Sequence, residues 1–276
     1  MDFGTGSTAD VFIFDNKPAS YASLPTPVGN GSRGYCTDCT AGKAITGGGG
    51  TGNYVIRVNG AWVGTPITTW SEVQLKDGTA SASSKALIFG TNNIPGDFIA
   101  VGIECNFTGS ISPLSAPTLA VTDTQNNTYT ATDIIQSDAN ANRWVQIFYA
   151  PAIVGGPNTV TVTSSVNLCT YIHATAVEYS GIKLISPLDA IAAATTGNSG
   201  TIVTPSFNQT VGDLVVGMWN INAGGNGFGG TGFTLRGADT SSSFEDTASA
   251  ATGQTIIGVG NSGQWVIIGA AFKRQP

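Results

Sequence analysis

Residues 159–163 read TVTVT, and they follow the turn-forming residues GGPN at positions 155–158. Successive side chains of a β-strand point to opposite faces, so this alternation predicts a strand with buried valines on one face and threonines on the other. Short segments of similar character recur from about residue 85 to the end of the chain, separated by clusters rich in Gly, Asn and Pro. The pattern predicts an all-β fold, an antiparallel two-sheet β-sandwich, with a jelly-roll or an immunoglobulin-like order of strands left open.

The other predicted strands show how a core is built. They lie at residues 86–89, 98–105, 118–122, 128–133, 144–149, 170–179, 214–221, 233–236, 255–259 and 265–272. In residues 98–105 (FIAVGIEC), the two-residue period places one apolar set on a common face, namely Ile99, Val101, Ile103 and Cys105. Residues 265–272 (WVIIGAAF) are apolar on both faces, which predicts a central strand that is covered twice. Only residues 187–194 (PLDAIAAA) could form a turn or two of helix, and we favour the non-helical interpretation.

Composition narrows the functional classes. Only 10% of the 276 residues are charged, the formal net charge is −6, and glycine occurs 37 times. A surface covered by hydroxyls and amides suits fibres, capsid proteins and adhesins better than cytoplasmic enzymes. Basic residues are scattered singly apart from Lys273-Arg274, so a nucleic-acid partner is not expected. The apolar runs are too short for a membrane span.

Three regions differ in composition. Residues 1–34 are expected to form an extended attachment arm, residues 35–84 a small β-hairpin and linker module, and residues 85–276 the sandwich. Within the middle region, residues 54–58 and 61–63 flank Asn59-Gly60, which is a strong signal for a two-residue hairpin turn. The serine- and alanine-rich stretch at residues 78–86 (GTASASSKA) is interpreted as a linker.

Several short stretches carry a resemblance to a known type of domain. They are VTDTQNNTY (121–129), NTVTV (158–162), AVEYSG (176–181), PLD (187–189), GDLVVG (212–217), GFTLR (232–236) and WVIIGAAFK (265–273). In this order they resemble an uncharacterised β-sandwich domain of bacterial and phage surface proteins. The resemblance covers residues 85–273 and implies a fold, but no catalytic motif.

A second resemblance concerns the region before the sandwich. Residues 35–39 (YCTDC), 50–52 (GTG) and 59–63 (NGAWV) are similar to a module of phage fibre-like proteins that joins the attachment end to a distal domain. The resemblance implies a virion surface protein of tail-fibre, head-fibre or decoration type. Residues 1–84 would then contact other virion proteins and form a homo-oligomer, for which a trimer is preferred.

The expected location follows from the same reading. The start of the sequence (MDFG) lacks the basic and apolar regions of a signal peptide. We therefore expect the protein to reach the exterior through host lysis, on the virion surface. The alternatives are a secreted bacterial adhesin or carbohydrate-binding module at the cell surface, and a polysaccharide depolymerase.

A host-surface glycan is the expected ligand, and one segment suits it best. Trp219, Asn220 and Asn222 run into a loop that contains Phe228. Aromatic rings stack on the apolar faces of sugars, while amides bind the hydroxyls. The competing interpretation is that Trp219 continues the apolar face of Val215 and belongs to the core.

The four cysteines leave several alternatives open. Cys36 and Cys39 form a CxxC pair, which could be structural thiols, a local disulfide, or part of a metal site completed by a second chain. Cys105 and Cys169 lie on or beside predicted strands and are most simply buried apolar residues, and their spacing does not decide whether they pair.

Catalytic and cofactor motifs are weak, so no enzyme, cofactor or metal is expected. His173 is the single histidine, lies mid-strand, and has no nucleophile motif to serve, which favours a structural role. The run GNGFGG (225–230) matches a dinucleotide-binding spacing, but a strand is expected after it where that motif needs a helix. Acidic residues that could form a hydrolytic pair cannot be placed together from sequence, namely Glu104, Glu178, Asp213, Glu245 and Asp246.

Overall fold

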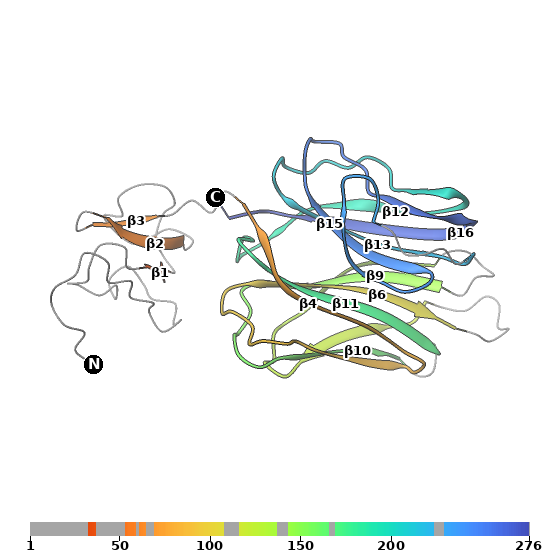
Figure 1. Ribbon diagram of the computed structural model, residues 1–276, viewed down its shortest axis with the longest axis horizontal. Helices are drawn as coiled ribbons and strands as arrows, with labels where there is room; N and C mark the ends of the chain where they lie inside the picture. The colour runs from red at the N-terminus through yellow and green to blue at the C-terminus, as the bar shows by residue number, and fades with distance from the viewer. Residues whose placement is uncertain are drawn as a thin grey trace. The chain divides into compact units, whose positions relative to one another are not determined.

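Figure 1 shows the computed structural model of the chain. The structure describes residues 33–36, 53–58, 61–64, 69–107, 116–136, 143–165, 169–223 and 229–275, with the backbone alone for 33–36, 53–58, 61–64 and 134–136. The chain divides into two compact units, Met1–Thr69 with Gln275–Pro276, and Trp70–Arg274. Most of the arm predicted at residues 1–34 lies outside the described residues.

The described part of the smaller unit is a three-stranded antiparallel sheet. Its strands, in spatial order, are β1 (Arg33–Cys36), β2 (Asn53–Val58) and β3 (Ala61–Gly64). Val58 pairs with Ala61 across the two residues between the strands, so the hairpin predicted around Asn59-Gly60 is confirmed.

The larger unit is a stack of antiparallel sheets, and the all-β sandwich prediction is confirmed. The central sheet has the strand order β4 (Ser71–Ala80), β11 (Tyr171–Ser180), β6 (Phe98–Asn106), β9 (Arg143–Ala150) and β8 (Thr130–Gln136). A smaller sheet has the order β5 (Ser84–Ile88), β10 (Thr159–Ser164) and β7 (Leu119–Asp123). The C-terminal sheet has the order β12 (Leu188–Val203), β16 (Ile257–Phe272), β13 (Leu214–Ile221), β15 (Ser242–Ala248) and β14 (Thr234–Ala238).

The described residues of this unit form three sheets, where the sequence predicted two (Figure 1). The central sheet lies between the others because its middle strands are apolar on both faces, as in β6 and β11, where nearly every side chain is buried. Ile99 and Val101 face the smaller sheet and pack with Val160 and Val162 of the TVTVT strand, while Phe98 faces the C-terminal sheet.

The last strand is covered on both faces, as predicted. Val266, Ile268 and Ala270 of β16 face the central sheet, in the same cluster as Phe98. Trp265 and Ile267 face the opposite side, where Phe207 and Ile256 from connecting segments cover them. A third apolar cluster therefore lies on the outer face of the C-terminal sheet.

Two sequence-based assignments differ from the structure, namely the linker at residues 78–86 and the start of the sandwich at residue 85. The linker at residues 78–86 is wrong, because β4 and β5 occupy most of it and the larger unit begins at Trp70. These residues form strands because β4 pairs with β11 and β5 pairs with β10 along their lengths. Residues 188–203 form strand β12 along β16, so no helical turn occurs at 188–194. In the described part of the chain, no helix has the length and apolar character needed to cross a membrane.

Candidate functional site

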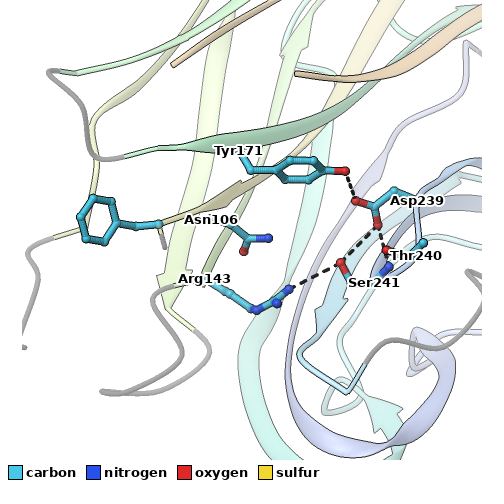
Figure 2. A pocket seen from close by; sticks show the side chains of 7 residues that line it. Asn106, Arg143, Tyr171, Asp239, Thr240 and Ser241 are labelled. Carbon is cyan, nitrogen blue, oxygen red and sulfur yellow. Dashed lines mark hydrogen bonds between the residues drawn. The ribbon is translucent and has the colours of Figure 1, made fainter. Parts of the chain in front are cut away.

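A pocket opens at one end of the central sheet, beside the turn between β14 and β15 (Figure 2). Its volume is about 320 Å³, and it is lined by Asn106, Phe107, Arg143, Tyr171, Asp239, Thr240 and Ser241. Strand register explains three of the walls: Asn106 at the end of β6 lies opposite Tyr171 at the start of β11, and opposite Arg143 at the start of β9. The turn residues 239–241 supply the other side.

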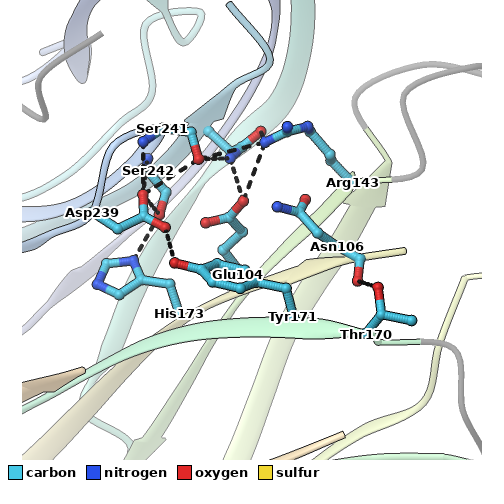
Figure 3. A network of polar contacts seen from close by, with 10 residues as sticks. Glu104, Asn106, Arg143, Thr170, Tyr171, His173, Asp239, Ser241 and Ser242 are labelled. Carbon is cyan, nitrogen blue, oxygen red and sulfur yellow. Dashed lines mark hydrogen bonds and ion pairs between the residues drawn. The ribbon is translucent and has the colours of Figure 1, made fainter. Parts of the chain in front are cut away.

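The two-residue period places the pocket walls and a buried polar cluster on one face. Asn106 and Glu104 of β6 face the C-terminal sheet, as do Tyr171 and His173 of β11. Asn220 of β13 and Ser242 of β15 meet them from the C-terminal sheet, through hydrogen bonds to Glu104 and His173 respectively. The interface between these two sheets is thus apolar around Phe98 and polar at the pocket end (Figure 3).

Glu104 lies in the floor of this polar region and is fully buried. Its Oε1 accepts hydrogen bonds from the Asn220 amide and from Arg143 Nη1, the latter at 3.4 Å. Its Oε2 is buried and has no hydrogen-bond partner among the described residues. Burial, followed by the negative charge of Asp239, raises the pKa of Glu104 to about 7.

His173 is held at both ring nitrogens. Nε2 lies 2.8 Å from Asp77 Oδ1, and Nδ1 lies 2.6 Å from Ser242 Oγ. Burial alone would lower the pKa of His173, but the hydrogen bond and charge of Asp77 outweigh burial, so the pKa lies above its usual value. The ring therefore has a fixed orientation between β4, β11 and β15.

Asp239 organises the turn that forms one wall of the pocket. Its Oδ1 accepts hydrogen bonds from the backbone N–H groups of Ser241 and Ser242, both at 2.7 Å. Its Oδ2 accepts the Tyr171 hydroxyl at 2.6 Å, across the sheet interface (Figure 2). Burial acts to raise the pKa of Asp239, but these hydrogen bonds outweigh it and hold the pKa below its usual range. Burial, followed by the same contact with Asp239, raises the pKa of Tyr171.

The carboxyl groups of Glu104 and Asp239 thus have pKa values shifted in opposite directions, as those of acid and base partners in hydrolytic enzymes are. Access separates them, however, because Asp239 lines the pocket whereas Glu104 is fully buried behind it. Among the described lining residues, Asp239 is the one carboxylate that a molecule in the pocket would meet. A molecule in the pocket would also meet an aromatic ring, an amide, a guanidinium and hydroxyls.

The residues predicted to bind glycans are not brought together at a surface. Trp219 is fully buried in the outer apolar cluster, so its role as a sugar-stacking ring is wrong, and the core interpretation holds. Asn220 is also fully buried, because it bonds Glu104 beneath the pocket. Asn222 is exposed and exchanges hydrogen bonds with Gln264. Phe228 lies outside the described residues.

The structure decides the state of one cysteine pair and leaves the other outside the described side chains. Cys105 and Cys169 form a disulfide, with their Cα atoms 5.3 Å apart, which decides the alternative that spacing left open. The bond lies directly before Asn106 on one strand and shortly before Tyr171 on the other, so it joins two pocket walls. Cys36 is the last residue of β1, but its side chain and the whole of Cys39 lie outside the described part of the chain.

The other acidic residues considered from sequence lie away from the pocket lining. Glu178, Asp213, Glu245 and Asp246 are all buried, and Glu245 and Asp246 are neighbours on β15. Glu178, for example, accepts hydrogen bonds from Gln74, Asn93 and the Ile94 backbone, which ties the loop after β5 to the central sheet.

Sequence reasoning missed the site because no single motif marks it. The available signal was a polar residue inside otherwise apolar strands: Glu104 in FIAVGIEC, His173 in YIHATAV and Asn220 in VVGMWNI. A buried polar side chain needs a partner, so three such interruptions in different strands indicate a shared cluster. Comparison with protein-family models, with curated proteins and with solved structures gave no match for this chain.

Proposed function

We propose that this chain is a surface structural protein of a bacteriophage particle, of tail-fibre, head-fibre or decoration type. In this proposal the part before Trp70 attaches to the particle and assembles the oligomer, with a trimer preferred. The larger unit is displayed outward and binds a host-surface glycan through the pocket between Tyr171 and Asp239. Many copies on one particle would multiply weak individual contacts.

The observation that carries the binding role is the chemistry of the pocket lining. Tyr171 and Phe107 supply aromatic surface, while Asn106, Arg143 and Asp239 supply donors and acceptors around a volume of about 320 Å³. Sugars offer apolar ring faces and hydroxyl groups, and sites for small polar ligands combine the two kinds of contact in this way. The hydrogen bonds of Asp239 fix its orientation before a ligand arrives, which lowers the entropy cost of binding.

Two further features support display outside the cell. The Cys105–Cys169 disulfide suits an oxidising environment. The low charge content, 10% of residues, suits a surface that contacts other uncharged polar surfaces. Both features fit a secreted adhesin as well, so the particle assignment rests on the resemblance of residues 35–63 to a phage fibre module.

Binding is favoured over cleavage because Glu104 is out of reach of the pocket. A polysaccharide depolymerase needs a proton donor that contacts the glycosidic oxygen and a second carboxylate across from it. Asp239 lines the pocket, but Glu104 is fully buried and its Oε1 is bonded to Asn220 and Arg143.

A pair of matched tyrosine variants tests the binding role. Tyr171 donates to Asp239 in the pocket, and Tyr129 donates to Asp123 at 2.9 Å outside it. Calorimetric titration with host envelope polysaccharide fragments should show about tenfold weaker binding for Tyr171→Phe, because Asp239 loses the hydrogen bond that fixes its orientation for the ligand. Tyr129→Phe should bind like the wild type. Equal affinities in all three proteins would contradict the pocket, and release of new reducing ends would support the depolymerase alternative instead.

The particle assignment needs a separate test. Immunogold electron microscopy of purified virions, with an antibody against the larger unit, should label the tail or the head surface. Labelling of uninfected bacterial cells, with none on virions, would support the adhesin alternative. Mass photometry of the full chain should give the mass of a trimer of 28.1 kDa chains, and a monomer would contradict the assembly role of the N-terminal part.

A further inference from the structure

Three side chains from separate elements converge behind the pocket. Glu104 comes from β6, His173 from β11 and Asp239 from the turn after β14, and each offers one ligand atom within 4.8 Å of the others (Figure 3). The set combines an imidazole nitrogen with two carboxylates, which is a donor combination that transition-metal ions bind.

Glu104 supplies an independent indication of a missing partner. Its side chain is fully buried, and Oε2 has no hydrogen-bond partner among the described residues, although Oε1 has two. In Figure 3 the second oxygen points to the side of the cluster where Asp239 lies. An unsatisfied buried carboxylate oxygen is unfavourable, and a cation between Glu104 and Asp239 would satisfy it.

His173 has the support that metal-binding histidines commonly show. Its Nε2 is bonded to Asp77 Oδ1, which also accepts the Thr175 hydroxyl at 2.6 Å. A carboxylate on one ring nitrogen fixes the ring and leaves the other nitrogen to the metal. Here the other nitrogen, Nδ1, bonds Ser242 Oγ at 2.6 Å (Figure 3), so the serine hydroxyl must turn aside for an ion to reach the ring.

We propose that Glu104, His173 and Asp239 form a site for a divalent transition-metal ion of the Zn²⁺ type. Mg²⁺ and Ca²⁺ fit less well because they prefer oxygen ligands alone. Tetrahedral Zn²⁺ ligands lie about 3.4 Å apart, so two ligand atoms at the 4.8 Å limit would need to approach each other by roughly 1.4 Å. Three protein ligands leave a fourth position for a hydroxyl or a water molecule. The site does not depend on the glycan proposal.

The cluster also brings ionisable groups of both signs together. Beside the three proposed ligands lie the Asp77 carboxylate, which bonds His173, and the Arg143 guanidinium, which bonds Glu104. Buried charges are stable only when they are paired or bind a metal, so the ion would stabilise the sheet interface as well.

The single histidine allows a direct test. The full chain is prepared with a tag free of histidine, carries Cys36→Ser and Cys39→Ser so that the CxxC pair cannot bind the metal, and is treated with a chelator. The ring nitrogens of His173 are then followed by ¹⁵N nuclear magnetic resonance during titration with Zn²⁺. The Nδ1 signal should shift and saturate at one equivalent. Unchanged His173 signals at a large excess of Zn²⁺ would overturn the site.

Variants separate a ligand from a merely structural role. Zn²⁺ affinity, measured by calorimetry, should be lost in Glu104→Gln and fall about 10–100-fold in Asp77→Asn, which supports the ring. Glu245→Gln alters another fully buried glutamate, away from the cluster, and should bind Zn²⁺ like the parent chain. Wild-type affinity in a folded Glu104→Gln would refute the proposal. If circular dichroism shows that Glu104→Gln does not fold, the Zn²⁺ affinity of Asp77→Asn and the His173 signals test the metal site instead. Sugar titration of the metal-free chain tests the glycan proposal separately.

Discussion

Gly102 on β6 and Phe244 on β15 interlock across the interface between the central and the C-terminal sheets. A Cβ atom at position 102 would lie 2.2 Å from Cδ2 of the Phe244 ring, well inside van der Waals contact. Phe244 is fully buried and packs in the same apolar cluster as Phe98 and Met218. The absence of a side chain at position 102 is therefore what allows the two sheets to approach at this point.

Gly102→Ala should destabilise the larger unit by about 1–3 kcal/mol, because the added methyl group must displace a ring in a closely packed core. Urea denaturation followed by tryptophan fluorescence measures the loss. Adding Phe244→Leu to Gly102→Ala should recover part of the stability, since the smaller side chain leaves room for the methyl. A double variant that loses the sum of the two single effects would show that these residues do not interlock.

The apolar strands could be predicted from the sequence, whereas strands with many polar residues could not. Strands such as β6 and β10 carry an alternation or a continuous apolar run, and each formed where it was predicted. β16 joins the two segments predicted separately at 255–259 and 265–272 into one strand. β15 (SSFEDTA) was not predicted, because its buried polar side chains resemble a loop in composition. They are stable in a strand because Ser242 bonds His173 and Asp246 bonds Arg236, which are partners on other strands.

The third sheet could not be predicted for a related reason. Two-residue periodicity tells which residues share a face, but it does not tell which sheet covers that face. The apolar character of both faces of β6 and β11 was visible, yet only the pairing of β12 to β16 into a separate sheet shows what lies over the second face. The pocket lies where the central and the C-terminal sheets pack together, so it could not be predicted from the sequence either.

The Cys105–Cys169 disulfide should contribute about 2–5 kcal/mol, because it closes a loop with a sequence separation of 64 residues in the unfolded chain. Cys105→Ala with Cys169→Ala should lower the urea midpoint accordingly. Because the bond precedes Asn106 and Tyr171, the double variant should also bind sugar more weakly while still folded. Cys36→Ser with Cys39→Ser is the control, and an equal loss of stability there would contradict this assignment.

Stability should fall as the pH rises from about 5 to about 8. Burial raises the pKa of Glu245 from 4.5 to about 8 and that of Asp97 from 3.8 to about 8. Within this window the folded chain keeps protons that the unfolded chain has lost, so stability is full below the unfolded pKa and declines through the folded one. Thermal unfolding followed by circular dichroism across this range measures the trend.

Glu245→Gln isolates one contribution to that trend. The amide stays neutral, so the Tm of the variant at pH 8 should exceed that of the wild type by roughly 2–4 °C for each kcal/mol recovered. At pH 4.5 the two proteins should differ little, since Glu245 is then protonated when folded. A variant with the same pH dependence as the wild type would show that Glu245 is not the titrating group.

Arg236 neutralises a buried carboxylate between two sheets. Its Nε donates to Asp246 Oδ2 at 2.6 Å, Nη1 bonds Glu72 on β4, and the Tyr179 hydroxyl also donates to Asp246. Arg236→Met would leave Asp246, which is 1% exposed, without its cation. We expect a loss of about 3–5 kcal/mol at pH 7 in urea denaturation.

The pH dependence of that loss distinguishes charge from packing. Burial raises the pKa of Asp246 despite the hydrogen bonds of Arg236 and Tyr179, so removing the guanidinium should raise that pKa further. At pH 5 Asp246 can then take up a proton, and the loss in Arg236→Met should shrink. Adding Asp246→Asn should restore stability at pH 7 for the same reason, because no buried charge remains to be neutralised. Equal losses at both pH values would mean that Arg236 acts through its aliphatic contacts.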